Sequence, residues 1–345
     1  MLREALAARA SDVHVEPMGG QVEIRFRVDG LLKTVNSYPA AVGNSVVMRL
    51  MVMGQLLTYR ADVPQEGRIR YEHAEAGVTR QLDLRLAIMP TAHGLRAALR
   101  MPADLIQPKS LEALELPAGV LGDLRKFARV EAGMLAVTGP AGSGKTTTIY
   151  ALLEYMARTS PGLSIISLED PVERLLAGVT QIEVNPFGEL TYERALKSIL
   201  RQDPQVLMLG EIRDAATASL AVQAALSGHR LICTFHASTP GGAVARLFEM
   251  GVEPYQITSA MYGVLAQRLV RRRSGRGYGG RVPLAEMAVM TETVRPLVLG
   301  RADAGAMDQM FRARVGHVTM RGIANELVRG GVTDEAEVAR VLGEG

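Results

Sequence analysis

The stretch that decides the fold is Gly139-Pro140-Ala141-Gly142-Ser143-Gly144-Lys145-Thr146, which matches the pattern G-x-x-x-x-G-K-[ST]. Before it, the apolar run from Met134 to Thr138 is typical of a buried strand. After it, Thr147 begins a segment whose apolar residues recur at helical spacing. A strand, a glycine-rich turn and the start of a helix are the surroundings that a phosphate-binding loop requires. A chance glycine-rich turn is the alternative interpretation.

The loop predicts a nucleotide site for electrostatic reasons. Glycines allow backbone N–H groups to converge on phosphate oxygens, and the N-terminus of the following helix adds partial positive charge. In such a loop Lys145 reaches the β- and γ-phosphates, and the Thr146 hydroxyl is a ligand of Mg²⁺. We therefore expect the segment from Gly139 to Thr147 to bind a nucleoside triphosphate with Mg²⁺.

The composition is that of an ordinary globular protein, with 48% hydrophobic and 22% charged residues among 345. This length suggests about two domains. No apolar run approaches the roughly 18–20 residues that cross a bilayer, and the N-terminus lacks the apolar segment of a signal peptide. The single cysteine, Cys233, excludes an intramolecular disulfide and a multi-cysteine zinc site. We therefore expect a soluble cytoplasmic protein.

The net charge of +3 argues against general binding of polyanions, so we expect no direct contact with nucleic acid. Basic residues nevertheless cluster at Arg268, Arg271, Arg272, Arg273, Arg276 and Arg281. Glycines and a serine interrupt the cluster, which favours a solvated loop. A contact with acidic lipid headgroups, nucleic acid or an acidic partner is the alternative, and the sequence does not decide between them.

Residues 1–103 have the pattern of a small α+β domain, because polar and apolar residues alternate in several short runs. The expected elements are strands over 21–28, 80–86 and 95–101, a hairpin turn at Asp29-Gly30 and a helix over 44–57. Prolines then mark a linker over residues 104–117.

From residue 118 to residue 289, short apolar runs alternate with helical patterns, which predicts a parallel sheet with crossover helices. The expected strands are 135–138, 164–168, 206–209 and 231–235. The remaining segment, residues 290–345, has the pattern of mostly short helices.

Two acidic residues follow predicted strands, where functional groups of parallel sheets gather. Glu169 lies in Leu168-Glu169-Asp170-Pro171-Val172-Glu173, where a carboxylate could polarise the attacking water or support Mg²⁺. Asp-Pro also favours a turn, so a structural role is the alternative. In the second segment, Gly210 stands where a phosphate-loop NTPase usually has an aspartate, so Glu211 must supply the carboxylate that acts on Mg²⁺ or its waters.

Histidines and arginines complete the candidate site. His236 and Ser238 follow an apolar strand, where a sensor of the γ-phosphate would lie, whereas His229 is as consistent with a structural role. Arg27, Arg85 and Arg100 could serve as bidentate phosphate ligands. Their spacing by itself does not distinguish them from exposed strand residues. The segment from Ala10 to Glu16 mixes a helix-cap pattern with an alternating strand and is similarly ambiguous.

Taken in order, these motifs resemble the secretion ATPases of type II secretion, type IV pilus and competence systems, over nearly the whole chain. The matching segments are residues 9–30, Pro64-Gln65-Glu66-Gly67-Arg68-Ile69, the phosphate loop, 169–173, 200–214 and 228–236. The resemblance implies a RecA-like P-loop NTPase domain preceded by a smaller α+β, PAS-like domain. It also implies a hexameric ring that binds ATP and Mg²⁺ between the two domains.

The resemblance assigns roles to individual residues. It makes Arg85 and Arg100 arginine fingers, Glu169 the general base, and Glu211 a group that acts on Mg²⁺ through water, although the last two roles are easily exchanged. His229 and His236 would sense the state of the nucleotide and couple it to domain movement. The implied partner is a membrane platform protein, with the ring peripheral to the cytoplasmic face of the inner membrane.

Two features depart from the family pattern. Many assembly ATPases carry a four-cysteine zinc module after the histidine segment, whereas here Ser274 to Val282 offers room for a loop, so no zinc is expected. The additional N-terminal domain of larger members is also missing, so the chain resembles a minimal member or a trimmed one.

Three functions are consistent with these residues. The first is an ATP-driven motor of type II secretion or of pilus or pseudopilus assembly, which the segment Pro64 to Ile69 favours. The second is a pilus-retraction or DNA-uptake ATPase of the same superfamily. The third is a nucleotide-responsive scaffold with negligible turnover, which the glycine at position 210 favours.

Overall fold

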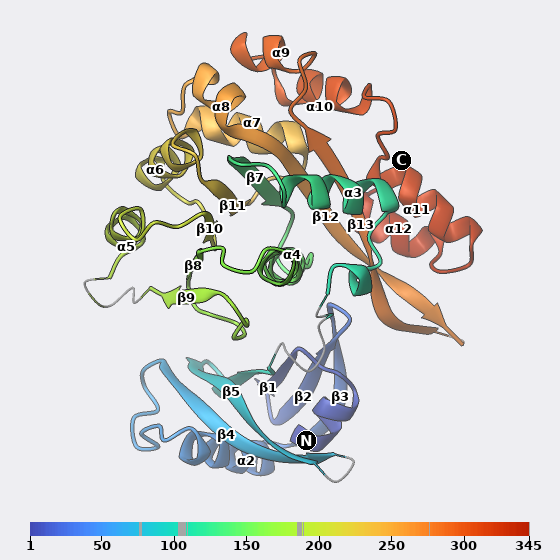
Figure 1. The fold of residues 1–345 in the computed structure, drawn as a ribbon. Helices are drawn as coiled ribbons and strands as arrows, with labels where there is room; N and C mark the ends of the chain where they lie inside the picture. Colours follow the sequence, from blue (N-terminus) through green and yellow to red (C-terminus); the bar gives the residue numbers. More distant parts are fainter. Residues whose placement is uncertain are drawn as a thin grey trace. The chain divides into compact units, whose positions relative to one another are not determined.

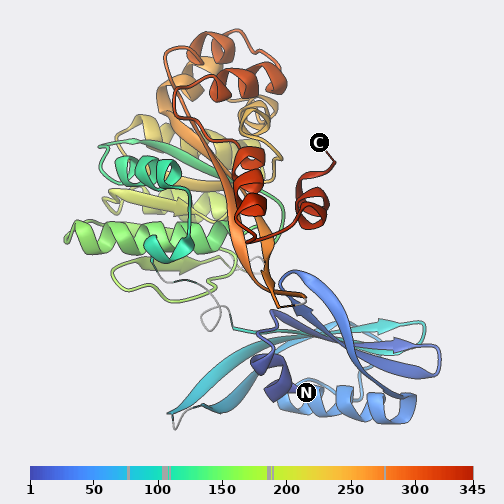
Figure 2. The same ribbon diagram turned by 90° about the vertical axis from the view of Figure 1, so that its right-hand side faces the viewer.

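The computed structural model of the protein describes residues 1–75, 78–102, 108, 110–184, 188, 190–275 and 277–344. The chain divides into two compact units, Met1–Gln107 and Pro108–Gly345. Each unit has its own sheet and its own hydrophobic core (Figures 1 and 2). Of the expected linker, residues 104–107 and 109 lie outside the described residues. Leu111, Leu114 and Leu116, by contrast, are buried in the core of the second unit.

The first unit is an antiparallel sheet with a long helix packed on one face (Figure 2). Its strands are β1 (Asp12–Met18), β2 (Gln21–Val28), β3 (Leu31–Pro39), β4 (Gln65–Glu75), β5 (Val78–Thr91) and β6 (Gly94–Arg100), and its helices are α1 (Leu2–Ala7) and α2 (Ala40–Met53). The strand order is β3-β2-β1-β6-β5-β4. Alternate residues of β1 and β2 are buried beneath α2, as the alternating pattern predicts. The expected strands and the hairpin turn at Asp29-Gly30 are therefore confirmed.

Helix α2 differs from its expected range, because it begins and ends four residues earlier than the predicted 44–57. Pro39 precedes the helix, and its ring fixes a φ that suits a helix start. The helix ends at Gly54, where a β-carbon would lie 2.9 Å from Leu86 Cδ2, so the chain packs closely against β5 at this point.

The second unit is a mixed sheet with the strand order β13-β12-β7-β11-β10-β8-β9. The strands are β7 (Gly133–Thr138), β8 (Ile165–Glu169), β9 (Thr180–Glu183), β10 (Val206–Leu209), β11 (Arg230–Phe235), β12 (Met261–Ser274) and β13 (Gly277–Val289). The helices are α3 (Ala118–Phe127), α4 (Lys145–Thr159), α5 (Tyr192–Ile199), α6 (Ala215–Leu226), α7 (Pro240–Glu249), α8 (Pro254–Ala260), α9 (Arg295–Leu299), α10 (Ala304–Arg312), α11 (Met320–Arg329) and α12 (Glu335–Leu342).

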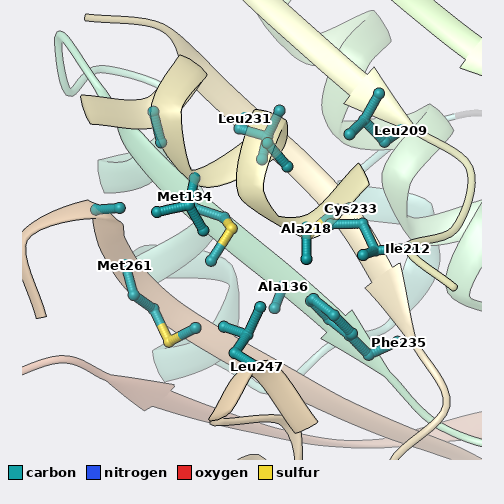
Figure 3. Close-up of a cluster of buried hydrophobic side chains, with 14 of the residues drawn as sticks. Met134, Ala136, Leu209, Ile212, Ala218, Leu231, Cys233, Phe235, Leu247 and Met261 are labelled. Atoms are coloured by element: carbon teal, nitrogen blue, oxygen red, sulfur yellow. The ribbon is translucent and has the colours of Figure 1, made fainter. Parts of the chain in front are cut away.

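Helices cover both faces of this sheet. Successive residues of each strand point to opposite faces and so pack against different helices. Met134, Ala136, Leu231 and Cys233 pack with α6 and α7, together with Phe235 (Figure 3). Leu135, Val137 and Ile232 pack instead with α3 and α4. Because both faces are buried, these parallel strands read as continuous apolar runs, which is why the sequence located them. The four expected strands and the short C-terminal helices are confirmed.

The arginine cluster is not a solvated loop, and that expectation was wrong. Arg268 to Arg273 lie in β12 and Arg281 lies in β13, and the two strands form a long antiparallel hairpin. Buried Val270, Val282 and Leu284 hold this hairpin against α11 and α12. Several of the arginines have acidic or carbonyl partners, which are Glu337 for Arg271, Glu115 for Arg272 and the Gly142 carbonyl for Arg281. Arg276 lies outside the described residues.

A buried carboxylate joins the hairpin to the C-terminal helices. Glu337 of α12 accepts hydrogen bonds from the Arg271 backbone and side chain and from Arg340. Burial by itself would raise the pKa of this carboxyl, but the bonds from Arg340 and Arg271 outweigh it and lower the pKa to about 2. The attachment of α12 to the hairpin therefore includes an ionised Glu337.

We predict that Glu337→Gln lowers the free energy of unfolding by about 2–3 kcal/mol at neutral pH, because it leaves the partly buried Arg271 without its anion. A carboxyl whose folded pKa is depressed stabilises above its unfolded pKa of 4.5. The difference between wild type and variant should therefore shrink as the pH falls from 4.5 towards 2, as followed by urea denaturation. The exposed Glu335→Gln on the same helix is the control and should change stability little. A pH-independent loss would contradict the role of the charge.

Candidate nucleotide site

The phosphate loop connects β7 to α4 at the carboxyl edge of the parallel strands. Gly142 and Gly144 have positive φ angles of 72° and 90°, which glycine adopts without strain. A β-carbon at position 139 would lie 2.4 Å from the Gln267 carbonyl oxygen, and one at Gly144 would lie 2.8 Å from Gln267 Nε2. The glycines are required because β12 runs directly against the loop.

Two polar side chains of the loop suit an anionic ligand. Lys145 Nζ donates hydrogen bonds to the carbonyls of Gly139 and Pro140, at 2.7 and 3.0 Å. Burial lowers the pKa of Lys145, the Glu211 carboxylate opposes this shift, and the positive charge of Arg268 adds to it. Among the described residues, Ser143 Oγ is buried without a hydrogen-bond partner. A phosphate group would supply acceptor oxygens for both side chains.

Sequence reasoning missed Gln267, which fixes the loop from the side of β12. Its side chain is 3% exposed, and its Oε1 accepts a hydrogen bond of 2.9 Å from Thr148 of α4. The neighbouring Arg268 donates to the Ser238 carbonyl at 3.0 Å. These contacts could have been expected only if the arginine cluster had been recognised as a strand beside β7.

The structure brings Glu211 and His236 together after β10 and β11. Glu211 Oε1 lies 2.8 Å from His236 Nε2, and Glu211 Oε2 accepts a hydrogen bond of 2.7 Å from Arg213. The two side chains are 18% and 60% exposed, and they line a cavity of about 510 Å³ together with Ser238. Two of the predicted site residues are thus in direct contact and accessible.

Glu169 has a different environment, although it also ends a strand. It is 3% exposed and accepts hydrogen bonds from Ser167 Oγ, Gln181 Nε2 and the Tyr150 hydroxyl. Burial and the Glu169 carboxylate raise the pKa of Tyr150, so this hydroxyl stays protonated and remains a donor. Both oxygens of Glu169 therefore already have donors within the core.

His229 is not brought to the loop by the fold of its own unit. It precedes β11, and its Nδ1 lies 2.8 Å from the Ala224 carbonyl. Because β11 runs parallel to β7, with Arg230 opposite Gly133 and Phe235 opposite Thr138, His229 lies at the amino end of the strand. The strand separates it from the phosphate edge by about 20 Å. Its contact with nucleotide stays a prediction that this placement does not support.

Arg85 and Arg100 lie side by side in the first unit. They are register partners on β5 and β6, so both side chains belong to the same face of the sheet. Arg100 also faces Asp12 of β1, with 3.4 Å between Arg100 Nε and Asp12 Oδ1. The structure thus places Arg85 and Arg100 next to each other, although their spacing in the sequence did not indicate that they are neighbours.

The polar groups near the loop fit a magnesium ion that a nucleotide carries. In the part of the chain that the structure describes, no cluster of three His, Cys, Asp or Glu side chains could hold a metal ion. Mg²⁺, however, usually takes one or two protein ligands together with phosphate oxygens and water. The Thr146 hydroxyl at the start of α4 and the Glu211 carboxylate are oxygen donors of this kind.

The family model described as type II/IV secretion system protein matches residues 1–340. The chain belongs to this family. HxcR, a type II secretion system protein of Pseudomonas aeruginosa, is 39% identical over 363 residues, which cover 99% of this chain and 76% of that protein. The type II secretion system ATPase E of Vibrio cholerae is 36% identical over 381 residues, which cover all of this chain and 74% of that protein.

Three further proteins resemble the chain over different lengths. PilB of Thermus thermophilus, a type IV pilus assembly ATPase, is 40% identical over 272 residues, which cover 79% of this chain and 30% of PilB. The solved structure of the Legionella pneumophila ATPase DotB matches 97% of this chain and 92% of DotB, with a TM-score of 0.77 and 24% identity. The retraction motor PilT with bound ADP matches 98% of this chain and 95% of PilT, with a TM-score of 0.67 and 24% identity. These two structures confirm the expected fold, a RecA-like NTPase preceded by an α+β domain.

We predict that Gly139→Ala weakens nucleotide binding at least tenfold, because its β-carbon would displace the Gln267 carbonyl and with it the loop. Titration with a fluorescent ADP analogue measures the dissociation constant. The control is Gly122→Ala in α3, where a β-carbon would meet nothing within 4 Å. The control should bind normally and gain about 0.5–1 kcal/mol of stability. Normal binding by Gly139→Ala would contradict the close approach of β12.

Proposed function

We propose that this chain is an ATP-hydrolysing motor that powers type II secretion or the assembly of a type IV pilus or pseudopilus. The observation that carries the proposal is the phosphate loop with Glu211 and His236 beside it, in a chain that belongs to the secretion family. The relatives named as ATPases of type II secretion and of pilus assembly support both the reaction and the system.

In this proposal the loop holds the phosphates. Backbone N–H groups between Gly139 and Gly144 and the N-terminus of α4 face the phosphate oxygens, and Lys145 exchanges its carbonyl partners for them. The Thr146 hydroxyl and Glu211 would hold Mg²⁺, directly or through water, and the ion would neutralise charge on the phosphates. No zinc is proposed, because the one cysteine, Cys233, is buried in the core.

The geometry favours Glu211 over Glu169 as the carboxylate that activates water. Glu211 is partly exposed and close enough to Lys145 to influence its pKa. Glu169 would first have to lose bonds from Tyr150, Ser167 or Gln181. We therefore assign water activation to Glu211, which in this role would hold Mg²⁺ through water rather than directly, and give Glu169 the role of holding the end of β8. His236, in contact with Glu211, would report the state of the γ-phosphate to the segment before α7.

The first unit would complete the site. Following the resemblance, we propose that Arg85 and Arg100 act as arginine fingers on the phosphates within a homohexamer, where they stabilise charge that develops on the γ-phosphate. The partner would be a membrane platform protein, with the ring at the cytoplasmic face of the inner membrane. Among the described residues, every helix is too short or too polar to cross a bilayer.

The surroundings of Gly210 remove the main argument for the alternative of a scaffold with negligible turnover. A β-carbon at this position would lie 2.8 Å from the Tyr192 hydroxyl and 3.3 Å from the Leu168 carbonyl. Packing therefore accounts for the glycine, and the next residue supplies the carboxylate. The alternative of a retraction ATPase is supported only by the likeness to PilT, and that likeness shows a shared fold.

We predict that Lys145→Ala abolishes ATP turnover, because the phosphates lose their one cation within the loop. Phosphate release is measured at a protein concentration that allows a ring to form. Lys126→Ala, which removes an exposed lysine from α3, is the control and should retain wild-type turnover. Undiminished hydrolysis by Lys145→Ala would refute the motor.

A second comparison assigns the two acids. Glu211→Gln should lower kcat by about 100-fold or more, whereas Glu169→Gln should lower it less and reduce thermal stability, because it disturbs a buried network. Both are measured by single-turnover hydrolysis and thermal unfolding. A larger kinetic loss for Glu169→Gln, at unchanged stability, would reverse the assignment.

A further inference from the structure

The segment from Asp12 to Glu16, which the proposed site leaves without a role, forms the central strand of the first unit. Strand β1 pairs with β2 on one side and with β6 on the other. Asp12, His14 and Glu16 alternate with buried Val13 and Val15, so the three polar side chains share the face opposite the core. That face is also the face of Arg100.

Asp12 contacts an arginine on each neighbouring strand. Its Oδ1 lies 3.4 Å from Arg100 Nε of β6, and its Oδ2 lies 3.4 Å from Arg27 Nε of β2. The Ser11 hydroxyl donates to Oδ2 at 2.9 Å and orients the carboxylate. One carboxylate thus bridges two guanidinium groups across three strands.

Glu16, four residues further along β1, repeats this arrangement, and His14 between Asp12 and Glu16 contacts one arginine. Glu16 accepts hydrogen bonds from Arg25 of β2 at 2.7 Å and from Arg96 of β6 at 3.0 and 3.1 Å. His14 Nδ1 lies 2.8 Å from Arg96 Nη2. Burial would raise the pKa of Glu16, but the bonds from Arg25 and Arg96 outweigh it and lower the pKa. The polar face of β1 therefore holds arginines along its whole length.

The contact between Asp12 and Arg100 contributes more to orientation than to stability. The Arg100 side chain is 69% exposed, and ion pairs in such surroundings contribute little to folding. An unpaired arginine in this position would sample many rotamers. Arg100 also lies directly opposite Arg85, and like charges in opposite register repel each other. Asp12 places a negative charge beside this pair and restricts Arg100 through its Nε, which leaves the two terminal nitrogens for a ligand.

We propose that Asp12 is the positioning residue of Arg100, and that the polar face of β1 exists to aim the arginines of β6. This inference rests on the proposed function in one respect, because it takes Arg100 as a group that acts on the nucleotide phosphates. Asp12 itself touches no substrate. Its removal should therefore affect turnover through Arg100, because its other partner, Arg27, has no role in the proposed site.

The test is a double-mutant cycle on the full-length chain. Asp12→Asn should lower kcat for ATP about five- to tenfold, and Arg100→Gln should lower it further. In the Arg100→Gln background, Asp12→Asn should cause no additional loss, because the residue that it positions is already gone. Asp12→Glu, which keeps the charge, should recover part of kcat.

Glu23→Gln serves as the matched control, because Glu23 is an acid of β2 that interacts with Arg25 and Thr34 rather than with Arg100. It should leave kcat unchanged, and thermal unfolding should show that all variants are folded. Independent, multiplicative losses in the cycle, or wild-type kcat for Asp12→Asn, would overturn the positioning role. Wild-type kcat for Arg100→Gln would instead refute the proposed finger and overturn the inference with it.

Discussion

The approach of β12 to the phosphate loop is the constraint on which the rest of the second unit depends. The Gln267 backbone lies so close to Gly139 that a methyl group would not fit between them, and the Gln267 side chain bonds to Thr148 of α4. One strand thereby fixes both the turn of the loop and the start of the helix that follows. Preorganised backbone donors bind phosphate without a cost of reordering, so this packing is the basis of the nucleotide site.

The same strand explains how the far part of the hairpin remains ordered. Strand β12 pairs with β13 from Gly263 to Ser274. Beyond Ala266, where its pairing with β7 ends, Val270 packs in an apolar cluster with α11 and α12. Two arginines of β12 pair with acids from distant parts of the chain, Arg271 with the buried Glu337 and Arg272 with Glu115. A buried ion pair adds specificity of arrangement more dependably than stability. Here it joins α12 to β12, while apolar residues hold both helices against the hairpin.

Sequence patterns correctly predicted the elements that depend on residues close together in the chain. The strand before Gly139 and the strands that end near Glu169 and Glu211 are largely apolar runs, and their carboxyl ends fall within a residue of expectation. Local composition indicated a loop at Arg268 to Arg281, whereas these residues form a hairpin whose first strand, β12, pairs with the distant β7 and finds acidic partners far away in the chain. His229 shows a related limit of sequence patterns, since its nearness along the chain to His236 conceals the length of the strand between them.

The two acids show why residue type and position in a motif do not settle a role. Glu169 and Glu211 both follow apolar strands, yet one has buried donors on both oxygens and the other contacts an exposed histidine. A carboxylate can accept a proton from water only where water reaches it, so access is the argument for Glu211 in the proposed reaction. In the first unit a neighbour, rather than burial, orients the functional side chain. The exposed Arg100 is held in one direction by its contact with Asp12. Charged groups that act on a ligand must remain accessible, and their neighbours must supply the order that burial would otherwise provide.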